Sequence, residues 1–203
     1  MSSDPRWSAL TPTRLVRTDA EQRVEVNALH LTESRIVLTT ARLVLREFAA
    51  DDAPFILELL NDPSWLRFIG DRGVRTLDDA RAYLANGPQK MYREHGFGLW
   101  RVERKADSTV IGMCGLLQRP NLADVDLGFA FLPRHWGRGF AREAAAATLA
   151  HAERVGGLKR VVALTALDNE RSIRLLEKLG FTFERIVRLA ADGPESRLFS
   201  ASL

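Results

Sequence analysis

The chain has 203 residues, of which 46% are hydrophobic and 27% charged, and its formal net charge is +3. This size and composition exclude an intrinsically disordered chain and indicate one α/β domain with its own core. Charges interrupt every apolar run well before the length of a bilayer span, so we expect no membrane segment. The basic residues alternate with Asp and Glu instead of forming a block, which argues against a nucleic-acid-binding protein.

Cys114 is the only cysteine of the chain. It excludes an intramolecular disulfide and a cysteine-based metal site. The N-terminal residues lack the apolar segment of a secretory signal, so we expect a cytoplasmic protein. The four histidines show no pairwise spacing typical of a metal site, and no metal is expected.

The first part of the chain shows no sustained hydrophobic period. Residues 1–34 are expected to form a flexible leader before a domain of residues 35–203. Alternating aliphatic residues over residues 35–48 then predict one strand.

Two helices are predicted next. Residues 51–52 are both Asp and predict a helix start, and Pro63 follows its end. A second helix is predicted over residues 76–93, because Asp79 stands in a capping-box position relative to the first residue. Gly and Pro at residues 87–88 predict a break or kink in this helix.

The remaining elements alternate more regularly between strands and helices. Strands are predicted over residues 97–103, 109–118, 125–132, 160–167, 183–189 and 197–203, with helices over residues 140–155 and 169–179. Gly180 predicts a left-handed end to the second of these helices. Several antiparallel strands with a late β-α-β-α-β section predict a single domain of the α/β (α+β) class.

The loop before the helix at residue 140 carries the strongest chemical signal. Helix N-termini expose unpaired amides and bind phosphate, and Gly137 and Gly139 would let a phosphate approach the backbone closely. Arg134, Arg138 and Arg142 add positive charge around this loop. A plain helix cap is the simplest alternative. A dinucleotide fingerprint would need a small residue at position 142, and a Walker loop would need Gly-Lys-Ser/Thr.

This loop resembles the signature of the GNAT acetyltransferase superfamily, Gln/Arg-x-x-Gly-x-Gly/Ala, which reads here as Arg134-x-x-Gly137-x-Gly139. The resemblance covers residues 40–203 and is closest to the branch with ribosomal-protein N-terminal acetyltransferases and some drug-modifying enzymes. Its further landmarks are Arg42-Leu43-x-Leu45-Arg46, Ile111-Gly112, Leu127-Gly128-Phe129, Asn169-x-x-Ser172 and Glu177-Lys178-Leu179-Gly180-Phe181.

The resemblance implies a mixed sheet of six to seven strands with about four helices. The strand ending at Leu132 would splay from the strand starting near Arg160, and acetyl-CoA, the co-substrate, would enter the opening. The pantetheine would lie along the first strand, the pyrophosphate on the amides after it, and Asn169 beside the pantetheine or a water. The implied cofactor-binding residues are Phe129, Ala130, Phe131, Leu132, Arg134, Gly137, Arg138, Gly139, Phe140, Ala141, Arg142 and Asn169.

The resemblance also suggests catalytic residues. Ser172 is the candidate for protonating the leaving thiolate, whereas many relatives use a tyrosine at the position of Leu176. Asp126 lies where the branch has a glutamate and is a candidate base acting through water, with Glu103 as a second candidate. Helix capping is an equally simple role for Asn169 and Ser172.

The implied activity is transfer of acetyl to a primary amine, either a protein N-terminus or a small molecule, by direct attack in a ternary complex. A transferase with another acyl-CoA donor and a non-catalytic acyl-CoA-binding module are the alternatives. No nucleic acid or membrane partner is expected, and the protein is expected to be a monomer or homodimer.

Overall fold

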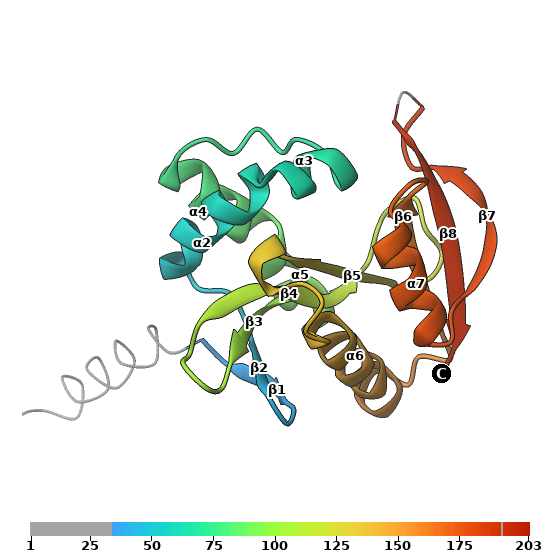
Figure 1. The fold of residues 1–203 in the computed structure, drawn as a ribbon, viewed down its shortest axis with the longest axis horizontal. Coiled ribbons are helices and arrows are strands. Elements are labelled where there is room, and N and C mark those ends of the chain that lie inside the picture. Colours follow the sequence, from blue (N-terminus) through green and yellow to red (C-terminus); the bar gives the residue numbers. More distant parts are fainter. Residues whose placement is uncertain (1–33, 192) are drawn as a thin grey trace, which may run out of the picture. The chain divides into compact units, whose positions relative to one another are not determined.

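The structure is a computed structural model that describes residues 34–191 and 193–203. The expected leader lies outside these residues except for Ser34. The described part contains one mixed sheet of eight strands in the order β1-β2-β3-β4-β5-β6-β8-β7, and α-helices on both of its faces (Figure 1).

The strands are β1 (Ile36–Thr39), β2 (Leu43–Arg46), β3 (Leu99–Arg104), β4 (Val110–Leu117), β5 (Asp126–Phe131), β6 (Arg160–Ala166), β7 (Thr182–Arg188) and β8 (Glu195–Ser202). The α-helices are α2 (Ala53–Asn61), α3 (Pro63–Phe68), α4 (Leu77–Asn86), α5 (Pro88–His95), α6 (Phe140–Gly156) and α7 (Glu170–Lys178). Two 3₁₀ turns, η1 (Ala50–Asp52) and η2 (Pro133–His135), precede α2 and α6. Within the described residues, no helix is both long and apolar enough to cross a membrane.

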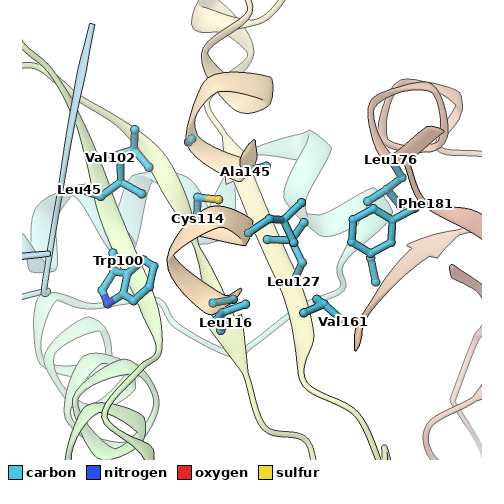
Figure 2. Packing of buried hydrophobic residues seen from close by; sticks show 14 of the residues in the cluster. Leu45, Trp100, Val102, Cys114, Leu116, Leu127, Ala145, Val161, Leu176 and Phe181 are labelled. Atoms are coloured by element: carbon cyan, nitrogen blue, oxygen red, sulfur yellow. The ribbon is translucent and has the colours of Figure 1, made fainter. Parts of the chain in front are cut away.

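The hydrophobic core has two parts, one on each face of the sheet. The larger part joins β1–β6 and β8 to α6 and α7, and Trp100, Leu127 and Leu176 lie in it (Figure 2). The smaller part joins α2, α3 and α4 to side chains such as Met113 and Leu132 on the other face. Buried alanines on α6, among them Ala145, let this helix approach the sheet closely.

The predicted class is confirmed, while the number of elements differs. The single strand predicted over residues 35–48 folds into the antiparallel β1–β2 hairpin, because Thr40 turns the chain by donating its amide to the Leu43 carbonyl at 2.9 Å. This turn gives eight strands instead of six to seven. The structure also contains α3, where Asp62 caps a new helix that begins with Pro63. The helix predicted over residues 76–93 breaks into α4 and α5 at the expected place.

The predicted splay between β5 and β6 is confirmed. The two strands are parallel neighbours, but only Asp126 and Val162 are in register. The Val162 amide donates to the Val125 carbonyl at 2.9 Å. Beyond this point β5 pairs only with β4, so the rest of its other edge has no neighbouring strand among the described residues.

Candidate functional site

The loop between β5 and α6 has the backbone conformation that its two glycines predict. Gly137 has a φ of 74° and Gly139 a φ of 80°, both in the left-handed region where glycine is favoured. A Cβ at Gly137 would meet no atom within 4 Å, so open space adjoins the loop there.

The start of α6 leaves its first amides available. Gly139 is the N-cap residue and no side chain of the described residues caps the helix. The amides of Phe140, Ala141 and Arg142 therefore lack an intrahelical acceptor, and the helix dipole adds positive charge there. Arg138 and Arg142 are exposed beside this turn. The arrangement is suited to an anion such as a phosphate.

Arg134, the first residue of the signature, points elsewhere. Its guanidinium forms an ion pair with both carboxylate oxygens of Glu58 on α2. Arg134 therefore ties the loop to the helix layer on the other face of the sheet.

The open edge of β5 presents backbone groups beside this loop. Leu132 donates its amide to Ile111 of β4 at 3.1 Å, whereas the Val125 carbonyl faces β6. Neighbouring residues of an antiparallel ladder direct their backbone amides and carbonyls to opposite edges. The backbone groups of Phe129 and Phe131 therefore point to the open edge, beyond the bridge between Asp126 and Val162. The Phe131 carbonyl accepts from the Trp136 indole at 2.7 Å. The amide and carbonyl of Phe129 consequently lie between the β5–β6 pair and the loop without a strand partner in the described part.

The start of α7 contacts the same loop. Asn169 caps α7 by accepting from the Ser172 amide at 3.2 Å, so the capping role is observed for Asn169. Ser172 is half-buried. The Arg171 guanidinium lies 5.0 Å from the centre of the Trp136 ring. Leu176, which stands where the family resemblance implies a tyrosine in many members, is buried in the larger core.

Asp126 occupies the point where β5 and β6 part. Its side chain is buried, and Oδ2 accepts from Arg119 Nε at 2.5 Å. The other oxygen, Oδ1, is buried without a hydrogen-bond partner among the described residues. Burial raises the pKa of Asp126, and Arg119 and the backbone amide of Leu164 oppose this shift. A buried carboxylate with a raised pKa is suited to accept a proton.

Glu103 is held in a different environment. It lies on β3, which β4 separates from β5, and its carboxylate accepts from Arg101 at 2.7 Å and lies 3.6 Å from Arg46. Arg101 also bonds Asp52 at 2.5 Å. The structure thus places Glu103 in a buried ion-pair network, apart from the residues of the loop, α7 and Asp126.

Comparison with known families agrees with this geometry. The family described as "Acetyltransferase (GNAT) domain" matches residues 42–182, a range that includes β5, the loop and α7. The chain belongs to the GNAT acetyltransferase family. The sequence-based assignments to this family and to the N-acetyltransferases are therefore confirmed.

Individual GNAT relatives cover most of the chain. The Bacillus subtilis protein named uncharacterized N-acetyltransferase YoaA is 30% identical over 155 residues, which are 75% of this chain and 86% of YoaA. A Bordetella pertussis structure assigned to the GnaT family is 32% identical with a TM-score of 0.68, and the match covers 82% of this chain and 99% of that one. A RimL ribosomal L7/L12 α-N-protein acetyltransferase, solved with coenzyme A, shares the fold with a TM-score of 0.71 at 16% identity over 83% and 98% of the two chains.

The GNAT site is contacted by three residues that the sequence alone did not assign to it. Arg171 stacks on Trp136, Arg119 pairs with Asp126, and Arg42 contacts the loop from the β1–β2 turn. Their positive charge does not distinguish them in the sequence, because arginines are frequent throughout this chain. Each contact also joins segments that are distant in the sequence. Arg42 does belong to one of the family landmarks, which was the only sequence feature that set it apart.

Proposed function

We propose that this GNAT protein transfers an acetyl group from acetyl-CoA to a primary amine, which attacks the thioester directly in a ternary complex. The observation that carries the proposal is the uncapped start of α6 next to the unpaired edge of β5. The start of α6 is suited to bind a phosphate, and the edge of β5 is suited to bind an extended chain with amide groups. Acetyl-CoA contains both parts, in its pyrophosphate and its pantetheine.

The cofactor contacts follow from the described geometry. The amides of Phe140, Ala141 and Arg142 would hold the pyrophosphate, with Arg138 adding charge from the loop. The backbone of Phe129 would pair with the pantetheine as a neighbouring strand would. Arg134 is assigned to holding the loop against Glu58 and not to the phosphate, since its guanidinium is already paired.

The reaction needs two proton transfers. The amine nitrogen forms a bond to the acetyl carbon, the carbon–sulfur bond breaks, the amine loses a proton and the thiolate takes one up. Asp126 is proposed to accept the amine's proton through water, and Ser172 to donate to the thiolate. A free thiol has a pKa of ~8.5, so a weak donor such as serine suffices. Glu103 is not proposed as the base, because Arg101 and Arg46 already engage its carboxylate.

The acceptor is a primary amine, either a protein N-terminus or a small molecule. An α-amine has a pKa of about 8 and is partly unprotonated at neutral pH, whereas a lysine-like amine of about 10.4 depends more strongly on a base. Arg119 lowers the pKa of Asp126 and so weakens it as a base. Asp126 is therefore better suited to an α-amine, which depends less on a base. The name of the RimL structure describes an α-N-protein acetyltransferase, and its shared fold makes protein N-termini a reasonable first acceptor to test.

The proposal is tested by titrating the protein with acetyl-CoA in a calorimeter, with CoA and NAD as controls. We expect dissociation constants on the order of micromolar for acetyl-CoA and CoA, and no binding of NAD. Thiol release is then measured with peptide α-amines, free amino acids, polyamines and aminoglycosides, and with succinyl-CoA as a second donor. Absence of CoA binding would contradict the proposal. Binding without thiol release from any amine would favour an acyl-CoA-binding module.

A further inference from the structure

The start of α6 is fastened from outside by the β1–β2 turn. Glu143, in the first turns of α6, accepts three hydrogen bonds from this hairpin. Their donors are Thr40 Oγ1 at 2.6 Å, the Arg42 amide at 2.9 Å and Arg42 Nε at 2.6 Å. The two segments are 101 residues apart in the sequence when measured from Arg42. The carboxylate of Glu143 thus anchors the phosphate-binding end of the helix.

The same Arg42 side chain also holds the loop. Its Nη1 donates to the Arg138 carbonyl at 3.0 Å, and its guanidinium lies 4.7 Å from the centre of the Phe140 ring. The Arg42 guanidinium therefore donates both to the Arg138 carbonyl, just before Gly139, and to the Glu143 carboxylate on the helix that follows. It is 49% exposed, so this clamp lies at the surface and not in the core.

The contact with Arg138 determines the direction of an amide. In a trans peptide the carbonyl and the following N–H point in opposite directions, and the described residues contain no cis peptide. Holding the Arg138 carbonyl towards Arg42 therefore points the Gly139 amide away from the hairpin. Gly139 has no Cβ to restrict this peptide, so an external contact is needed to fix it.

Arg42 also balances a charge. Burial raises the pKa of Glu143, but the hydrogen bonds from Thr40 and Arg42 outweigh it and the pKa is lowered. Glu143 is therefore ionised at neutral pH, close to a helix end that would receive a pyrophosphate. Without a cation beside it, this carboxylate would repel the phosphate.

We propose that Arg42 is a positioning residue for the pyrophosphate of the acyl-CoA: it fixes the Arg138–Gly139 peptide and neutralises Glu143, without touching the reacting atoms. The inference rests on the proposed function, and assigns a role to the β1–β2 hairpin within it. Because the contacts concern only the phosphate end, Arg42 affects cofactor affinity and leaves the chemical step unchanged.

The first test compares Arg42→Ala with Arg35→Ala. Arg35 lies before the same hairpin and also binds a carboxylate, that of Glu47, but does not contact the loop. Arg42→Ala is expected to raise the acetyl-CoA dissociation constant and KM about tenfold, as loss of one charge-assisted contact implies. The kcat of Arg42→Ala should stay within about twofold of that of the unaltered protein. For Arg35→Ala the dissociation constant, KM and kcat should all stay within about twofold.

A truncated donor separates positioning from general damage. Acetyl-pantetheine lacks the pyrophosphate, so its kcat/KM should be the same in Arg42→Ala and the unaltered protein. An equal loss with both donors would show that the variant harms the whole site, and would overturn the inference.

Arg42→Lys tests the geometry and serves as a second variant if Arg42→Ala does not fold. It keeps the charge, but a single ammonium does not reproduce the fork that reaches Glu143 and Arg138 together. We expect a weakening of about threefold or more. Affinity equal to that of the unaltered protein would overturn the positioning role. If the unaltered protein bound no acetyl-CoA, the proposed function itself would fail, whereas binding that no Arg42 variant changes would overturn only this inference.

Discussion

At the scale of single residues, Gly137 connects the loop conformation to cofactor binding. We predict that Gly137→Glu abolishes acetyl-CoA binding, because a carboxylate would stand in the open space next to the uncapped helix start. The fold should survive, since the only cost is a non-glycine residue in the left-handed region, about 1–2 kcal/mol. Calorimetry and thermal unfolding measure the two effects separately.

Gly96 offers a matched control for this variant. It also has a φ of 74° and open space at its Cβ position, but it ends α5, away from the loop. Gly96→Glu should lose a similar amount of stability and keep its affinity. If Gly137→Glu bound acetyl-CoA normally, the loop would be a helix cap only.

Asp126 leads to a prediction about pH. The carboxylate is the active form of a base, so kcat/KM should fall as the pH drops through the pKa of Asp126, which burial raises above its ordinary range. Arg119 lowers this pKa, so Arg119→Gln should move the acid limb to higher pH. Asp126→Asn should remove that limb and slow turnover by about a hundredfold or more.

Protonation of Asp126 would not unfold the protein at low pH, so it would not cause a loss of activity through unfolding. A raised folded-state pKa means that the folded protein binds this proton more tightly than the unfolded chain does. The contribution of Asp126 to stability is therefore present below its unfolded pKa and is lost as the pH rises through its folded pKa. Measuring the free energy of unfolding over the same pH range separates the two effects. An acid limb that stays in place in Arg119→Gln would remove Asp126 from the mechanism.

At the scale of elements, the start of α7 combines a cap with a candidate acid. Asn169→Ala removes the observed cap and should lower the free energy of unfolding by about 1 kcal/mol. Ser172→Ala keeps the cap, because Asn169 accepts from the Ser172 backbone and not from its hydroxyl. We predict that it lowers kcat on the order of tenfold, with unchanged acetyl-CoA affinity. Equal turnover in both proteins would leave Ser172 with no catalytic role.

The elements themselves were largely predictable from local patterns. The capping box at Thr76 and the left-handed Gly180 follow from neighbouring residues, and the structure shows both. The β1–β2 turn was missed because hydrophobic alternation continues across it, so no breaker residue reveals the reversal. The helix α3 was missed because Pro63 reads equally well as an end and as the first residue of a new helix.

The candidate site was predictable only where its residues are close in sequence. The conformation of Gly137 and Gly139 and the α6 start follow from one short segment. The contacts of Arg42 with Glu143, Arg134 with Glu58 and Arg119 with Asp126 depend on tertiary packing. Arg134 is an example, since its place in the signature predicts a phosphate contact, whereas its ion pair with Glu58 joins segments that are distant in the sequence.

At the scale of the whole molecule, the sheet consists of two parts that share a short seam. Strands β1–β5 form one part and β6, β8 and β7 the other, and only Asp126 and Val162 are in register between them. A ligand that pairs with β5 beyond this seam would bind the folded protein and not the unfolded chain. At a hundredfold excess over its dissociation constant, acetyl-CoA should then add about 2.7 kcal/mol to the free energy of unfolding.

Hydrogen exchange locates this effect within the sheet. The Phe129 amide faces the open edge of β5 and should exchange rapidly in the free protein, because no strand among the described residues accepts its hydrogen bond. Acetyl-CoA should slow its exchange, and acetyl-pantetheine should do so as well at saturating concentration, since the pairing involves the pantetheine. Cys114, inside the β3–β4–β5 ladder, should be protected in both states. If acetyl-CoA raised the overall stability while the Phe129 amide still exchanged freely, the cofactor would lie along another surface, and the unpaired edge of β5 would need a different explanation.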